Sequence, residues 1–221
     1  MDGERAVVIF GDVVNSRRDA ASADWLRTLR DALDDAYGDA RLAPFGFTQG
    51  DELQGLLRPD ADPIRAVLLG SLHPGRRPMR WVVVEGSVGP GAGPATERSG
   101  DAFLTARAAI ERSRTTRDGL AVRTGEPGAD RLLELIGPPL AEMLDGLTER
   151  QRTVARLVLV EGRRQADVAA SLGVSRATIS VTYARGRIRS IERLSSAVRA
   201  VIVAARLAAS EATSATGGVI A

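Results

Sequence analysis

Hydrophobic residues recur along the first 125 residues in two different periods. Short apolar runs bounded by glycine, aspartate or proline predict β-strands, and apolar residues that recur every three or four positions predict helices. The expected strands are residues 6–10, 44–49, 53–57, 80–85 and 120–123, and the expected helices are residues 23–37, 63–72 and 101–114. The order β-α-β-β-α-β predicts a ferredoxin-like α+β sheet with helices on one face.

The rest of the chain keeps helical spacing, which predicts an all-α region after the sheet. Glycine and proline residues mark a boundary either near positions 125–128 or at positions 137–139. The last ten residues are small and polar, as is typical of a disordered end. We therefore expect an α+β domain at 1–126, a linker helix at 127–146, a helix-turn-helix domain at 147–211 and a disordered tail at 212–221.

Residues 165–189 have the pattern of a helix-turn-helix. Val168 and Leu172 lie one turn apart, Gly173 suits a turn with positive φ, and Ser175 is a natural N-cap for the second helix. Such a second helix can lie in the major groove of DNA. The alternative is an ordinary helical hairpin with an arginine-rich solvated face. The residues expected to contact DNA are Ser175, Arg176, Ala177, Thr178, Ser180, Val181, Arg185 and Arg187.

Charge is distributed unevenly between the two parts of the chain. Residues 1–147 hold 18 arginines and 23 acidic residues, a net charge of −5, whereas residues 148–221 hold 12 arginines and 5 acidic residues, a net charge of +7. Only the basic part is therefore expected to approach nucleic acid. The absence of cysteine excludes disulfides, thiolate zinc sites and thiol nucleophiles.

No segment of the sequence predicts a membrane protein. The longest apolar stretch, residues 197–209, is interrupted by Arg199 and Arg206 and is too short to span a bilayer. No signal peptide precedes the first expected strand, so we expect a cytoplasmic protein. The apolar segment 197–207 is a candidate dimer helix, and it could equally pack on its own domain.

Around the helix-turn-helix, residues 147–194 resemble region 4 of sigma-70-type factors. The opening L-T-E-R-Q-R and the later T-I-S-V-T-Y-A-R-G-R-I-R carry this resemblance, with Tyr183 in place of the usual leucine and Gly186 in place of the usual alanine. A glycine weakens a helix by about 1 kcal/mol relative to alanine, so we expect a bend there. The resemblance implies double-stranded DNA as a partner and RNA polymerase as a further candidate.

Two carboxylates in the first domain are candidate metal ligands. Asp12 closes the first strand and Asp51 lies at the turn of the expected hairpin, so the two can meet at one end of the sheet. Close carboxylates repel unless a cation separates them, and Mg²⁺ accepts carboxylates together with substrate phosphates. The candidate phosphate-binding residues are Ser16, Arg17 and Arg107. The alternative is that Asp12 caps a helix and Asp51 is a turn residue.

Three blocks of the first domain resemble the SatD family of bacterial proteins: V-V-I-F-G-D-V-V-N-S-R, F-T-Q-G-D-E-L-Q-G-L-L and S-G-D-A-F-L-T-A-R-A-A-I. Each block is also similar to class III nucleotidyl cyclases and, more distantly, to GGDEF and palm domains. The cyclase resemblance implies that Asp12 and Asp51 bind metal and that Arg107 contacts phosphate. The cyclase asparagine is Phe103 here, and the purine-selecting lysine is replaced near Phe47. The resemblance therefore favours nucleotide binding over cyclisation.

Three functional hypotheses follow from these patterns. The preferred one is a DNA-binding transcriptional regulator, expected to be a homodimer, whose first domain either senses a nucleotide, with Mg²⁺ as the candidate cofactor, or mediates dimerisation. The second is a Mg²⁺-dependent nucleotidyl cyclase or nucleotidyltransferase that its helix-turn-helix targets to a site. The third is an interaction module in which both domains bind protein, with RNA polymerase as the candidate.

Overall fold

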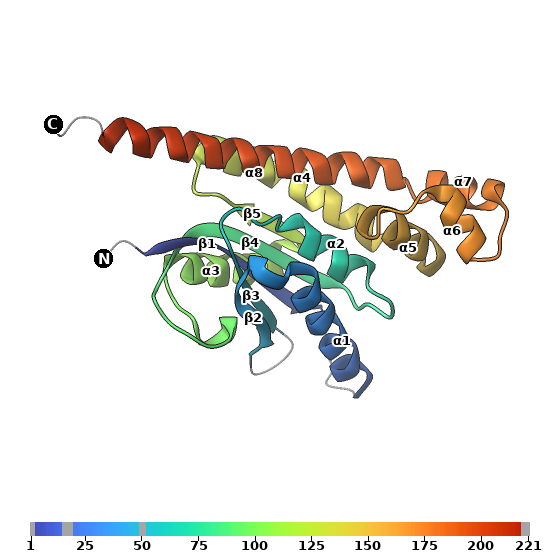
Figure 1. Ribbon diagram of the computed structural model, residues 1–221, viewed down its shortest axis with the longest axis horizontal. Helices are drawn as coiled ribbons and strands as arrows, with labels where there is room; N and C mark the ends of the chain where they lie inside the picture. Colours follow the sequence, from blue (N-terminus) through green and yellow to red (C-terminus); the bar gives the residue numbers. More distant parts are fainter. Residues whose placement is uncertain (1–2, 15–19, 49–51, 218–221) are drawn as a thin grey trace.

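The computed structural model describes residues 3–14, 20–48 and 52–217 of the 221-residue chain. An α+β sheet domain is followed by a helical region that extends along one side of it (Figure 1). In chain order the elements are β1 (Glu4–Val13), α1 (Ala20–Tyr37), η1 (Gly38–Ala40), β2 (Arg41–Phe47), β3 (Glu52–Leu57), α2 (Ile64–Leu72), β4 (Met79–Val88), η2 (Ala95–Glu97), α3 (Asp101–Thr116), β5 (Leu120–Arg123), α4 (Pro127–Asp145), α5 (Glu149–Ala155), the π-helical η3 (Arg156–Val160), α6 (Gln165–Ser171), α7 (Arg176–Arg185) and α8 (Ile188–Gly217).

The sheet has the strand order β2-β3-β1-β4-β5. Strand β1 lies at its centre and pairs antiparallel with β3 on one side and β4 on the other. Strand β2 pairs antiparallel with β3, and β5 extends the sheet by pairing parallel to β4. The first four strands thus follow the ferredoxin-like order that the sequence predicts, and the α+β fold class is confirmed.

Alternating residues of β1 supply two different cores. Val7 and Ile9 face the side of the sheet covered by α1 and α2, and Val8 and Phe10 face α3. The two helices of the β-α-β-β-α-β unit, α1 and α2, thus share one face as the sequence predicts, whereas α3, which follows this unit, lies on the other. It is the crossover between the parallel strands β4 and β5, which leaves it free to cover the face that α1 and α2 do not.

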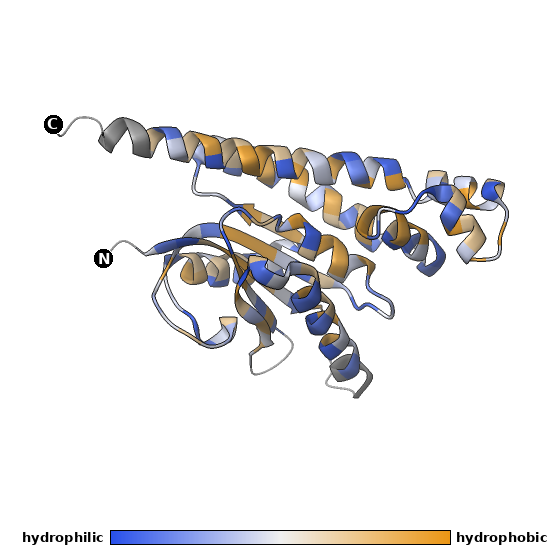
Figure 2. Cartoon of the chain, in the orientation of Figure 1, coloured by the Kyte–Doolittle hydropathy of each residue, from blue (hydrophilic) through white to orange (hydrophobic). Residues whose placement is uncertain are grey.

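The core on the α1 and α2 side continues without a break into the helical region. It includes Leu133 of α4 and Val198 and Ile202 of α8, and α4 packs against both β5 and α8. Hydrophobic residues recur along α8 (Figure 2). Helix α8 extends to Gly217, although the sequence suggested disorder from residue 212; its alanine-rich composition, without proline, favours continuation of the helix.

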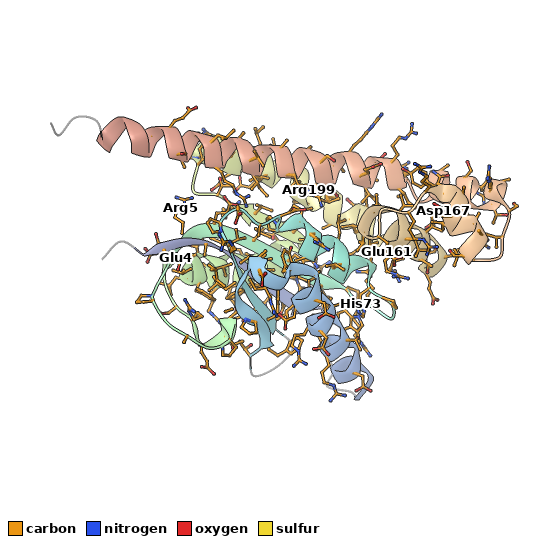
Figure 3. The ribbon with its side chains drawn as sticks, in the orientation of Figure 1. Glu4, Arg5, His73, Glu161, Asp167 and Arg199 are labelled. Atoms are coloured by element: carbon orange, nitrogen blue, oxygen red, sulfur yellow. The ribbon has the colours of Figure 1, made fainter. Side chains whose placement is uncertain are left out.

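Ion pairs also join the helical region to the sheet domain. Arg199 lies on the side of α8 that faces the sheet domain, with its Nε 2.8 Å from a carboxylate oxygen of Asp62 (Figure 3). Arg76, in the loop before β4, pairs with Asp145 at the end of α4 at 2.5 Å. Across residues 3–14, 20–48 and 52–217, none of the helices combines the length and apolar character needed to cross a membrane.

Candidate nucleic-acid interface

Helices α6 and α7 form the helix-turn-helix that the sequence predicts. Val168 and Ala169 of α6 and Ile179 of α7 are buried where the two helices meet. The turn depends on Gly173, whose φ of +63° is a conformation that a side chain would strain. The backbone amide of Val174 then donates to the carbonyl of Ala169 over 3.1 Å, which fixes the start of the second helix.

Ser175 caps α7. Its Oγ accepts a hydrogen bond from the backbone amide of Thr178 at 3.1 Å and lies 2.9 Å from the Thr178 hydroxyl. A serine in this position satisfies an amide that the helix itself leaves without a partner. Ser175 therefore stabilises the start of α7, independently of any contact that it makes with a partner molecule.

The outer face of α7 is open to solvent. Of the α7 residues, all of which the structure describes, Ile179 alone is fully buried. Thr178 is half-buried, and the other candidate DNA-contacting residues are exposed: Ser175, Arg176, Ala177, Ser180, Val181, Arg185 and Arg187. The structure thus brings all eight candidates to one exposed helix and its two ends.

A break separates α7 from α8 where the sequence predicted a bend. Helix α7 ends at Arg185, and Arg187 has a φ of +49°, in the left-handed region. Gly186 between them is buried, and a Cβ there would lie 3.2 Å from Cγ of Gln151. The close approach of α5 favours glycine at this position and holds Arg187 beside the end of α7.

A groove of about 610 Å³ runs between α7 and the start of α5. Thr148 and Gln151 form a capping box that begins α5, which leaves Arg150 exposed in its first turn. Arg150 is a candidate that sequence reasoning missed; the T-E-R-Q signature of the capping box could have located it. The groove is lined by Thr148, Arg150, Gln151, Ala177, Thr178, Val181, Thr182 and Arg185.

Exposed arginines in the first turn of α5 and at the two ends of α7 carry charge that no carboxylate of the described residues neutralises by direct pairing. Within the part of the chain that the structure describes, Arg150, Arg176 and Arg185 form no ion pair with a carboxylate, and neither does Arg187. Exposed guanidinium groups without a carboxylate partner are available to contact phosphate.

A second cluster of charged residues lies at one end of the sheet, on the α3 side. Asp12 is the cross-strand neighbour of Glu52 in β3 and of Arg80 in β4. Its Oδ2 accepts a hydrogen bond from Arg80 at 3.0 Å, and its Oδ1 accepts one from Arg114 of α3 at 2.8 Å. Hydrogen bonding to Asp12 raises the pKa of Arg114 above its ordinary value. Both oxygens of Asp12 are therefore occupied by guanidinium groups.

Arg107, the predicted phosphate contact, lies in the same cluster. It is 3.4 Å from Glu52 and stacks over the ring of Phe10 at 5.5 Å, and it remains half-exposed. Sequence reasoning missed Glu52, although alternation along β3 places it beside Asp12 once the register is known. The other predicted ligands, Asp51, Ser16 and Arg17, lie outside the described residues.

The described residues do not form a complete cation site by themselves. Among them, no group of three or more histidine, aspartate or glutamate side chains could hold a metal ion. Asp12 and Glu52 have the right chemistry for Mg²⁺, but each is paired with arginine. A cation would have to displace Arg80 or Arg114 before it reached Asp12.

Comparisons with known proteins bear on both parts of the chain. A search of curated proteins found no significant match. A bacterial light-regulated adenylyl cyclase is similar in structure over 54% of this chain and 75% of its own, with 17% identity and a TM-score of 0.40. A regulator of polyketide synthase expression from Bifidobacterium adolescentis is similar over 93% of this chain and 81% of its own, with 15% identity and a TM-score of 0.27. We draw no functional inference from similarities this low.

The family comparison concerns the helical region alone. The resemblance of residues 5–115 to the SatD family, and that of residues 147–194 to sigma-70 region 4, remain predictions. The family model that matches is described as KORA: TrfB plasmid transcriptional repressor. It matches residues 139–212, a span that contains the end of α4, all of α5, η3, α6 and α7, and most of α8.

Proposed function

We propose that this protein is a DNA-binding transcriptional regulator that contacts duplex DNA through α7. One observation carries the proposal: α7 presents an exposed face whose flanking arginines have no carboxylate partner among the described residues. The match of residues 139–212 to a plasmid transcriptional repressor family supports it. In this arrangement α7 lies in the major groove, as the second helix of a helix-turn-helix does.

The arginines at the ends of α7 and next to it contact different parts of the DNA. Arg176 and Arg185 stand at the two ends of the helix, where they reach base edges or the nearest phosphates. Arg187, beyond the break, and Arg150, across the groove, are placed to contact the sugar-phosphate backbone on either side. These contacts give affinity that falls as the salt concentration rises, since they release counterions from the DNA.

The sheet domain, in this proposal, is a nucleotide-responsive module. Arg107 and Arg114 project from α3 at the end of the sheet and are partly exposed, so phosphate groups can reach both. Mg²⁺ would join a bound nucleotide at Asp12 and Glu52 once the phosphates have drawn these arginines away. Cyclase chemistry is not part of the proposal, because Phe103 stands where the cyclases have an asparagine and the purine-selecting lysine is replaced near Phe47.

Salt-dependent binding to randomised duplex DNA tests the proposal. The full chain should bind, and the double substitution Arg176→Ala with Arg187→Ala should weaken binding severely and reduce the slope of log affinity against log salt by about 1.8. The matched control, Arg112→Ala with Arg131→Ala, removes two exposed arginines from α3 and α4. Unchanged affinity in the first variant, or an equal loss in the control, would refute the assignment.

A further inference from the structure

We infer that α7 recognises the methyl groups of thymine at the centre of its binding site. The inference rests on the proposed function and adds what the helix reads. Ile179 is buried on the inner side of α7. Successive helical residues are about 100° apart, so Ala177, Val181 and Ala184 lie about 140° to 200° around the helix from Ile179. The stripe that points away from the protein is therefore apolar.

This stripe is exposed rather than covered by the rest of the chain. Ala177 and Ala184 are exposed, and Val181, between them, keeps 50% of its surface accessible. A branched aliphatic side chain at the centre of a solvent-facing helix gains nothing from water. An apolar partner that enters the groove beside α7 would remove it from solvent.

Between its two terminal arginines, α7 lacks the side chains that read base edges by paired hydrogen bonds. The helix, R-A-T-I-S-V-T-Y-A-R, contains no asparagine, glutamine, aspartate, glutamate or lysine. Its long donors are Arg176 and Arg185, one at each end. Between them, Ser180 is the exposed hydroxyl, and it makes at most a single short-range contact.

The two threonines in the groove strengthen this reading because their hydroxyls are already engaged. The Thr182 hydroxyl donates to the carbonyl of Thr178 at 2.8 Å. The Thr178 hydroxyl lies 2.9 Å from Oγ of Ser175. Both threonines line the groove together with Ala177 and Val181, and their engaged hydroxyls are not free donors for a base.

Thymine is the base that matches such a surface. In the major groove it alone presents a methyl group, and apolar side chains discriminate it by contact with that group. Arg150, across the groove from Val181, would meet the backbone phosphates of the strand that passes through. The expected half-site therefore has thymine opposite the centre of α7.

Replacing thymine by uracil removes this methyl group and changes nothing else in the base. The full chain is first used to select duplexes from a randomised library, and affinity is then measured for the selected duplex with thymine or with uracil at its central positions. Each contacted methyl that is lost should weaken binding about fourfold. The discrimination should disappear in Val181→Ser and persist in Val203→Ser, which alters an equally exposed valine on α8.

The outcomes separate this inference from the proposed function. If no duplex is bound at any salt concentration, the proposed function fails. If duplexes are bound but thymine and uracil forms bind equally well, methyl recognition is excluded while DNA binding stands. Discrimination that survives unchanged in Val181→Ser would also overturn the inference, because the methyl contact would then be made elsewhere.

Discussion

Arg206 of α8 donates a hydrogen bond from Nε to a carboxylate oxygen of Glu85 in β4 over 2.8 Å. The same guanidinium donates to the carbonyl of Ala61 at 2.9 Å. Glu85 is buried, and burial raises its pKa above the ordinary 4.5, whereas the hydrogen bond and the charge of Arg206 lower it. This contact joins the helical region to the central part of the sheet.

Replacing Arg206 by leucine should lower the free energy of unfolding by about 3 kcal/mol at pH 7, because it leaves the Glu85 carboxylate buried and unpaired. The variant lacks the interactions that lower the pKa of Glu85, so that pKa should rise further. A carboxyl whose pKa is raised by folding favours the folded state below its unfolded pKa of 4.5, and this contribution is lost as the pH rises through the folded-state pKa. Urea unfolding should therefore show a smaller loss at pH 4 than at pH 7.

The second substitution Glu85→Gln provides the control for this prediction. It removes the charge that Arg206 compensates, so the double variant should recover part of the stability lost by Arg206→Leu at pH 7. Equal destabilisation at pH 4 and pH 7 would show that lost packing, and not the buried charge, causes the effect.

Ser175→Ala should lower the free energy of unfolding by about 1 kcal/mol, because the amide of Thr178 loses its capping oxygen. Ser175→Asn retains a capping oxygen and should stay close to the parent protein. Measuring urea unfolding and DNA affinity of both variants separates the effect of losing the helix cap from the effect of losing a contact with DNA. Reduced DNA affinity in Ser175→Asn at unchanged stability would indicate that the hydroxyl itself touches the DNA.

Arg187→Gly should leave the fold as stable as before or more stable by up to about 1 kcal/mol, since glycine adopts the positive φ of this position without strain. DNA affinity should fall in the same variant, because the phosphate contact proposed for Arg187 is lost. Thermal unfolding and a salt titration of DNA binding measure the two effects. Arg187→Val should destabilise the fold. A valine variant as stable as the parent protein would show that the positive φ at this position causes no strain.

Mg²⁺ alone should not raise the melting temperature, because the carboxylates it needs are paired with arginine. A nucleoside triphosphate with Mg²⁺ should raise it, as a ligand bound to the folded state stabilises by about 2.7 kcal/mol at a hundred times its Kd. Arg107→Ala should abolish this shift, whereas Arg112→Ala on the same helix should retain it. No shift with any of the four triphosphates would exclude a nucleotide-responsive module.

A homodimer should form through the apolar residues left exposed on α4 and α8. Leu135 and Leu207 are 71% and 61% exposed, and introducing glutamate at both should convert the dimer into a monomer in sedimentation equilibrium. DNA affinity should fall as well, since paired half-sites need two helix-turn-helix units. Leu104→Glu on α3, a site 71% exposed, is the control, and a monomeric parent protein would contradict the prediction.

Local patterns in the sequence were sufficient to predict the main strands and helices and the helix-turn-helix. Alternation in β1, the helical spacing around Val168, and the Gly173 and Ser175 signals each act within a few residues, so they can be read without the fold. The role of α7 in binding DNA stays a prediction, although its exposure agrees with it.

Contacts between residues far apart in the sequence could not be predicted from such local patterns. The pairing of Asp12 with Arg114 joins positions 102 residues apart, and the burial of Gly186 against Gln151 depends on how α5 approaches α7. The placement of α3 on the second face likewise depends on where β5 joins the sheet. Each of these is set by tertiary packing, which leaves no periodic signature in the sequence.

Because α8 begins immediately after Arg187 and its buried residues Val198 and Ile202 share one core with the sheet, the end of the molecule proposed to bind DNA is not an independently folding unit on a flexible linker. Grafting residues 147–211 onto another protein would expose that apolar surface to solvent. It would also leave Arg206 without its partner Glu85. Swapping DNA specificity in this architecture would therefore be accomplished more safely by exchanging the outward residues of α7 than by exchanging whole segments.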